Sequence, residues 1–152
     1  MSDAVTGTRA LVVERELPHP PEKIWRALTQ PHLMEEWLTK SDFKPVVGHR
    51  FSIRRNPRPD LNIVVDCLVL EVEPNRTLSY RWDGMGLETI VTWTLTPSRA
   101  GTHLRMEQSG FRSDQKRAYG GAMGGWRQFF EKLEHALARN DQPVPAQENG
   151  RA

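Results

Sequence analysis

Side chains capable of acid–base chemistry are present in this sequence, but they follow no recognised spacing. General acid–base catalysis needs ionisable groups with suitable pKa values gathered at one place. The candidates are Asp66, Glu88, His49, His103 and a tyrosine, either Tyr80 or Tyr119. Alternation along its strand puts His103 on a solvent-facing side, and the other residues form no recognisable catalytic set.

Two polar residues share strand faces with apolar ones, which makes them candidate ligand contacts. Asp66 has the same parity as Val64 and Leu68, and Gln108 has that of Met106. Burying such a group without a partner costs about 1–3 kcal/mol. Asp66 therefore either points inward or lies where the strand twists outward. Gln108 either orients a carbonyl or hydroxyl of a ligand, or makes a hydrogen bond at the strand end.

Sequence patterns for metal, covalent or nucleotide chemistry are missing. The chain has no His-x-x-x-His pair and no Gly-x-Ser-x-Gly turn. Its single cysteine, Cys67, has no evident base and stands in an apolar run, so we interpret it as a structural thiol. The glycine-rich segment 120–125 lacks the Gly-Lys-Ser/Thr ending of a phosphate-binding loop. We therefore expect no metal and no cofactor.

Length and composition limit the class of protein. A chain of 152 residues is long enough for one domain with one core. The formal net charge of +2 gives little reason to expect nucleic-acid binding. No apolar run approaches the ~20 residues of a membrane-spanning helix. Residues 1–8 lack the features of a secretory signal, so we expect a cytoplasmic location.

One basic cluster stands out. Arg50, Arg54, Arg55 and Arg58 lie around the segment 56–60, whose prolines and asparagine indicate a loop between strands. A solvated loop explains the cluster, and a site for an acidic ligand or partner is the alternative. Arg55 is also a third polar residue that shares a strand face with apolar neighbours.

Hydrophobic periodicity indicates the elements that would position these residues. Residues 9–16 predict a strand, and 18–38 predict two short helices separated at Gln30-Pro31, because the residue before a proline disfavours helix. An antiparallel meander follows. Its predicted strands cover 51–54, 62–73, 77–82, 91–95 and 103–108. The apolar face of this meander needs a cover.

A long amphipathic helix at 119–139 is the candidate cover. Apolar residues recur there at helical spacing, namely Tyr119, Met123, Trp126, Phe130, Leu133 and Leu137. Four glycines in its first turns (Gly120, Gly121, Gly124 and Gly125) each cost about 1 kcal/mol relative to alanine. We expect them to loosen the helix start or to allow close approach to the sheet, so that 111–125 would form a gate over a pocket.

The order of these elements, together with several motifs, resembles the SRPBCC (START/Bet v 1-like) superfamily. The chain is most similar to the branch named after the C-terminal domain of the activator of heat-shock-protein-90 ATPase. The matching segments are 21–29, Trp37, 70–82, Ser109-Gly110-Phe111 and Gly124-Gly125-Trp126. The resemblance implies an α+β helix-grip fold, with a curved antiparallel sheet, two short helices after the first strand and a long C-terminal helix over the sheet.

The resemblance covers 9–139, which we expect to form a single domain. Residues 1–8 are then a flexible N-terminus, and the composition of 140–152 is typical of a disordered tail.

The resemblance also implies a cavity between the sheet and the last helix. The predicted lining is large and apolar, with few polar groups. It comprises Trp37, Phe51, Ile53, Asp66, Tyr80, Trp82, Trp93, Met106, Gln108, Tyr119, Met123, Trp126 and Phe130. Ordinary core packing also explains such a set. If a cavity is present, aromatic walls favour a hydrophobic or aromatic ligand.

We therefore expect a non-catalytic carrier or sensor of a small hydrophobic molecule. The first alternative is a cyclase or hydratase acting on a polyketide-like substrate, which requires Asp66, Gln108 and a tyrosine to converge. The second alternative is a chaperone cofactor or another protein-interaction module, which is implied only by the family resemblance and leaves a protein partner open.

Overall fold

The computed structural model describes residues 8–139, apart from the side chains at 57 and 58. Predictions for the N-terminal segment up to residue 7 and for the tail 140–152 concern residues outside this range. Six antiparallel strands form one sheet in the order β1-β6-β5-β4-β3-β2. The strands are β1 Arg9–Leu17, β2 Arg50–Arg58, β3 Leu61–Glu73, β4 Thr77–Gly84, β5 Leu87–Ser98 and β6 Gly101–Phe111.

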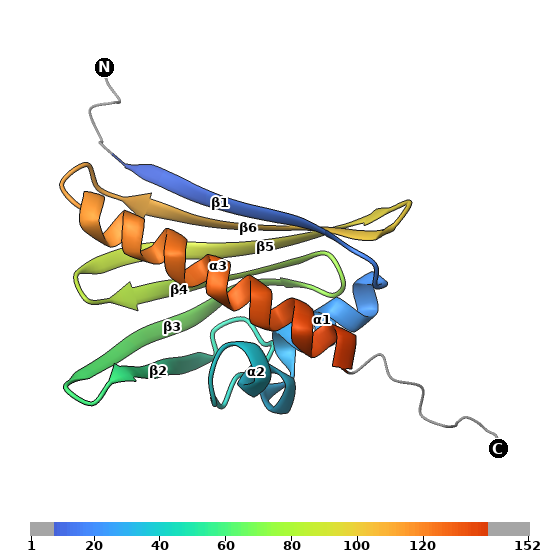
Figure 1. Ribbon diagram of the computed structural model, residues 1–152, viewed down its shortest axis with the longest axis horizontal. Helices are drawn as coiled ribbons and strands as arrows, with labels where there is room; N and C mark the ends of the chain where they lie inside the picture. The colour runs from blue at the N-terminus through green and yellow to red at the C-terminus, as the bar shows by residue number, and fades with distance from the viewer. Residues whose placement is uncertain (1–7, 140–152) are drawn as a thin grey trace.

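Three helices complete the fold, namely α1 Pro21–Thr29, α2 Pro31–Trp37 and α3 Lys116–Arg139. The predicted α+β helix-grip arrangement is confirmed. Figure 1 shows α1 and α2 at one end of the sheet and α3 running across one of its faces. The backbone of α3 approaches α2, α1 and β1 most closely.

The two short helices are separated where the sequence predicts. Gln30 has an extended backbone (φ −96°, ψ 122°) and is both the C-cap residue of α1 and the N-cap residue of α2. The proline that follows it disfavours a helical conformation at this position. The indole N–H of Trp37 donates to the carbonyl oxygen of Ala27 at 2.8 Å, so α2 is tied back onto α1.

The alternation in β3 differs from the prediction. Val65, Cys67 and Val69 are buried, and Asp66 is exposed. The register with β4 shifts between Val69 and Glu71, which marks a β-bulge. Before the bulge, apolar residues stand on both faces of the strand (Ile63, Val65, Cys67 and Val69 on one, Val64 and Leu68 on the other), so alternation alone does not show which face is buried. Of the two alternatives for Asp66, the outward one is therefore correct, and its place in the predicted lining is wrong.

The basic cluster also lies differently. Arg54 lies in a strand, as predicted, but β2 runs from Arg50 to Arg58 and so also includes Arg50 and Arg55, which were expected to flank the strand. Arg54 is exposed and Arg55 is half-buried. Because successive side chains of a strand point to opposite faces, Arg55 lies on the same face as Phe51 and Ile53.

The last helix starts earlier than predicted, at Lys116, and continues through all four glycines. A Cβ atom added at any of them would meet no atom within 4 Å outside the helix backbone and the neighbouring residues. The prediction that the glycines allow close approach to the sheet is therefore wrong. They leave open space instead.

Candidate ligand-binding site

A cavity of about 530 Å³ lies between α3 and the β2–β3–β4 side of the sheet, and β5 and β6 contribute one residue each to it. Its sheet-side lining is Ile53, Arg55, Leu61, Ile63, Val65, Trp82, Gly84, Met85, Leu87 and Gln108. Its helix-side lining is Arg117, Ala118, Gly121, Ala122, Gly125, Trp126 and Phe129. The size is within the range of roughly 300–1,000 Å³ that is usual for small-molecule sites.

Small residues on one face of α3 account for the open space. Ala118, Gly121, Ala122 and Gly125 follow the i, i+3, i+4, i+7 spacing of a single helix face. Further along the same helix this face carries large aromatic side chains, such as Trp126, which pack against the sheet. The cavity therefore lies under the first half of α3, where the face toward the sheet carries mainly alanine and glycine.

The turn between β4 and β5 forms another part of the wall. Met85 and Gly86 both have positive φ angles, 53° and 82°. Two residues with positive φ match the twist of an antiparallel hairpin. The side chain of Met85, which is 61% exposed, lines the cavity at this turn. The segment before α3 is held to the turn because the Gln115 side-chain amide donates to the carbonyl of Gly86 at 2.8 Å.

Gln108 is the fully buried polar residue of the cavity wall. Its side-chain oxygen accepts a hydrogen bond from the Trp126 indole N–H at 2.8 Å, and its amide nitrogen donates to the Thr89 hydroxyl at 2.9 Å. Thr89 in turn donates to the carbonyl of Trp82 at 2.7 Å. An indole N–H can only donate, so the amide oxygen must face Trp126. The second amide N–H of Gln108 has no protein acceptor in the described part of the chain.

Four of the predicted site residues line this cavity, namely Ile53, Trp82, Gln108 and Trp126. A second group is buried in the packed core away from the cavity wall, namely Trp37, Phe51, Tyr80, Trp93, Met106 and Phe130. Tyr119 and Met123 are partly buried against the core and also lie outside the lining. Ordinary core packing therefore explains most of the predicted set.

Tyr80 illustrates this packing. Its hydroxyl accepts a hydrogen bond from the Trp93 indole N–H at 2.8 Å. Burial raises the pKa of Tyr80 far above that of a free tyrosine. The residue is a satisfied core tyrosine that stays protonated at neutral pH.

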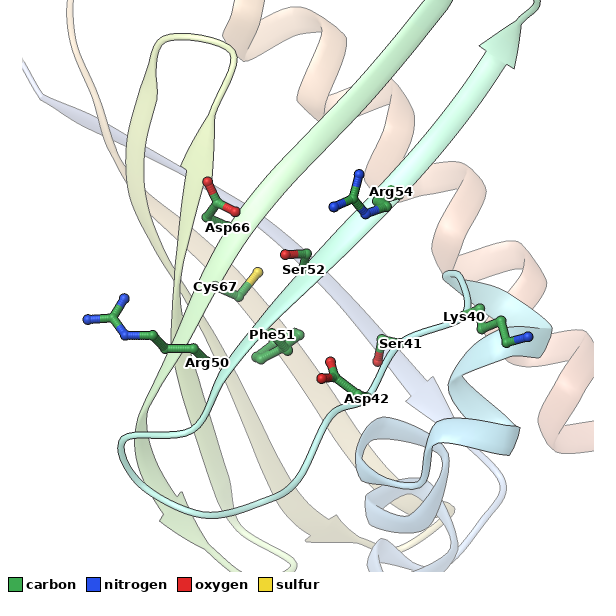
Figure 2. A pocket seen from close by; sticks show the side chains of 9 residues that line it. All are labelled: Lys40, Ser41, Asp42, Arg50, Phe51, Ser52, Arg54, Asp66 and Cys67. Carbon is green, nitrogen blue, oxygen red and sulfur yellow. The ribbon is translucent and has the colours of Figure 1, made fainter.

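Asp66 lies outside the cavity, in a polar surface hollow of about 570 Å³. Figure 2 shows this hollow between β2 and the segment that carries Lys40, Ser41 and Asp42. Arg54 also lines it. Since Gln108 lines the cavity under α3, the structure does not bring Asp66 and Gln108 together. The acid–base set required by the cyclase or hydratase alternative does not converge.

Sequence reasoning missed the small residues of α3, the apolar residues Leu61, Ile63 and Leu87, and Phe129. Arg55 could be found, since alternation from Phe51 and Ile53 puts it on the inner face. Nothing in helical periodicity distinguishes a face that packs from a face that leaves a cavity.

Within residues 8–139 no group of three or more His, Cys, Asp or Glu side chains could hold a metal ion. Over the same residues no helix has the length and apolar character required to cross a membrane.

The family model described as "Activator of Hsp90 ATPase homolog 1-like protein" matches residues 18–138. The chain belongs to this family. No curated protein sequence matches the chain.

Solved structures show the same fold as this activator-like chain. Protein MLL2253 from Mesorhizobium loti is 64% identical, with a TM-score of 0.79 over 86% of this chain and 98% of its own. A protein from Rhodobacter sphaeroides is 25% identical, with a TM-score of 0.76 over 86% and 92%. DynU16, from the dynemicin biosynthetic locus, is 24% identical, with a TM-score of 0.71 over 87% and 47%. This last likeness shows the fold alone.

Proposed function

We propose that this activator-like protein binds a small, largely apolar ligand in the cavity under α3, and that it carries or senses the ligand without converting it. The observation that carries the proposal is the apolar cavity of about 530 Å³ that the small-residue face of α3 leaves open. Aromatic rings from both sides, Trp82 on the sheet and Trp126 on the helix, form its walls; their ring centroids are 5.1 Å apart.

The chemistry of the lining favours binding over catalysis. Its polar side chains are Gln108, Arg55 and Arg117, and the described lining contains no carboxylate, histidine, cysteine or lysine. An amide does not titrate, and a guanidinium stays protonated in proteins. General acid–base catalysis requires a group that exchanges a proton near neutral pH, so these walls are suited to holding a molecule.

Gln108 would give the ligand an orientation. Its second amide N–H lies in a buried wall without a protein acceptor. An unsatisfied buried donor costs roughly 1–3 kcal/mol. A ligand carbonyl, ether or hydroxyl oxygen placed against this group would recover that cost. We therefore expect an apolar molecule with at least one acceptor.

Filling the cavity from the helix tests the proposal. Leucine in place of Gly121 or Gly125 would occupy the open space, whereas Gly120 and Gly124 are exposed, lie outside the lining and serve as matched controls. The probe is N-phenyl-1-naphthylamine, a neutral apolar dye that fluoresces when it leaves water. Leucine is the better helix former at all four positions, so loss of binding cannot be ascribed to a weaker helix.

We expect saturable dye binding to the wild-type protein and to Gly124→Leu, and at least about a tenfold weaker affinity for Gly125→Leu, because the walls no longer leave room. Equal binding by Gly124→Leu and Gly125→Leu would contradict the proposal. So would the absence of saturable binding to the wild-type protein.

A further inference from the structure

We infer that the ligand of this cavity is an organic acid, whose anionic group is bound by Arg55 while its apolar body lies under α3. The inference rests on the binding function proposed above and adds the chemical class of the ligand. It is carried by the position of Arg55, by the way its guanidinium is held, and by the charge of the cavity.

The position of Arg55 is unusual for a cation. Along β2 the inward side chains are Phe51, Ile53 and then Arg55, and the first two are 5% and 0% exposed. The pattern would continue with an apolar residue. Its neighbour Arg54 points to the other side of the strand and lines the polar surface hollow. One of two adjacent arginines therefore faces the apolar cavity and the other faces water.

An aromatic ring holds the Arg55 guanidinium in place. The guanidinium carbon lies 4.7 Å from the centroid of the Phe129 ring. That ring is itself held by edge-on contacts with Trp126 and Trp37, at centroid distances of 5.4 Å and 6.4 Å. Stacking covers one face of the planar group but leaves the N–H donors at its edge free. The edge is the part that binds a carboxylate through two parallel hydrogen bonds.

The cavity carries positive charge without compensation. Within the described residues no carboxylate pairs with Arg55 or with Arg117, and the lining contains no acidic side chain. On the outer face of the sheet, by contrast, Arg81 is paired with Asp83 and Arg105 with Glu107, both at 2.8 Å. An anionic ligand would supply the missing partner of Arg55 in a site where water screens the charges less than at the surface.

The remainder of the lining restricts the kind of anion. Inorganic phosphate or a nucleotide requires several donors around the anion, whereas the walls next to Arg55 are Ile53, Ile63 and Val65. A single anionic group on an apolar body matches both the cation and these walls. The ligand class is thus an organic acid with one anionic group on a largely apolar body.

Two dyes that differ by one charged group test the inference. N-phenyl-1-naphthylamine is neutral, and 8-anilinonaphthalene-1-sulfonate has the same ring system with an added sulfonate. We expect the wild-type protein to bind the anionic dye at least about tenfold more tightly, as for one charge-assisted hydrogen bond in a partly buried site. Arg55→Gln should remove this preference, so that the two dyes bind this variant with affinities within about twofold of each other.

The controls separate the cation from the fold. Arg54→Gln changes the adjacent arginine, which faces the other side of β2, and should keep the preference. Arg55→Lys keeps the positive charge but loses the planar guanidinium with its parallel N–H donors. This variant should retain part of the preference for the anionic dye. Circular dichroism and thermal unfolding of each variant show whether it is folded.

The outcomes distinguish the two proposals. If the neutral dye binds and Gly125→Leu blocks it, but the anionic dye has no advantage or keeps its advantage in Arg55→Gln, the organic-acid inference is overturned and the binding function stands. Loss of the advantage in Arg117→Gln alone would also overturn the assignment to Arg55. If neither dye binds, or if Gly125→Leu has no effect on either, the binding function itself is overturned.

Discussion

The indole N–H of Trp126 on α3 donates a hydrogen bond to the side-chain oxygen of Gln108 on β6, 2.8 Å away. Both residues line the cavity, and the bond connects its helix side to its sheet side. Through Thr89 on β5 the connection continues to the backbone of Trp82 on β4. This series of hydrogen bonds fixes the distance between α3 and the sheet beside the cavity.

Gln108→Leu should lower the free energy of unfolding by about 1–3 kcal/mol, because it leaves the buried indole N–H of Trp126 without an acceptor. Trp126→Phe in the same background removes the orphaned donor, so the double variant should be more stable than the sum of the two single changes predicts. Denaturant unfolding of the four proteins measures this coupling.

The control for this cycle is Glu107→Gln, which alters the neighbouring residue on the outer face of β6 and removes only its ion pair with Arg105. Partly exposed ion pairs contribute about 0–1 kcal/mol. Strictly additive effects of Gln108→Leu and Trp126→Phe would show that the hydrogen bond contributes nothing to stability.

Alanine in place of each glycine of α3 should stabilise the protein. A Cβ at Gly120, Gly121, Gly124 or Gly125 meets no atom within 4 Å outside the helix backbone and the neighbouring residues, and alanine is better than glycine in a helix by about 0.8–1.0 kcal/mol. We expect a rise of that order in the free energy of unfolding for each single change, measured by urea denaturation. A fall for Gly121→Ala or Gly125→Ala would mean that α3 lies closer to the sheet than described.

The fold could be predicted because its signals are local. Prolines at 20, 21 and 31 and the alternation in β4, β5 and β6 each specify an element. The inner face of β6 was correct at Gln108 for the same reason. In β3 the residues 63–69 are apolar on both faces except at Asp66. Alternation within the strand therefore could not show that Val65 and Cys67 face the core and Asp66 faces outward, because packing against the neighbouring elements decides it.

The site was harder to predict than the fold. Large apolar residues such as Trp93 and Phe130 indicate a core, and the structure packs them against each other with ring centroids 5.7 Å apart. The cavity depends instead on where side chains are missing, at Gly121 and Gly125. A sequence shows such glycines only as a weakness of the helix. Their role becomes visible when the facing strands are in place.

Cys67 should be protected from alkylation in the folded protein. The residue is 3% exposed, and burial, followed by the nearby charges of Asp66 and Asp83, raises the pKa of its thiol. Only the thiolate reacts. At about pH 8, where a free cysteine is partly ionised, iodoacetamide should label the native protein far more slowly than the denatured protein.

Mass spectrometry of samples quenched at intervals measures both rates, and Cys67→Ala shows the background. Asp66→Asn should change the native rate little, because burial is the largest cause of the raised pKa. Comparable labelling of native and denatured protein would show that the thiol is accessible.

His103 should make stability depend on pH. Its two ring nitrogens lie 2.6 Å from a carboxylate oxygen of Glu14 and 2.5 Å from one of Glu16. Both nitrogens can donate only when the ring is protonated. Hydrogen bonds to Glu14 and then Glu16 therefore raise the pKa of His103 above 6.5, and the bond from His103 lowers the pKa of Glu16 below 4.5.

A raised histidine pKa favours the folded state when the ring is protonated, so this contribution is complete below about pH 6.5 and is lost as the pH rises through the folded-state pKa. The lowered pKa of Glu16 acts in the opposite direction: its contribution is present above about pH 4.5 and is lost as the pH falls. The β1–β6 edge should thus be most stable between these values.

The stability difference between wild-type protein and His103→Gln, from urea unfolding, should be largest near about pH 5.5 and should shrink above about pH 8. If the difference stays constant from pH 5 to pH 9, the charge of His103 does not contribute to stability. The control is Thr96→Ser, at the β5 position that pairs with His103. This change should shift the free energy of unfolding equally at every pH.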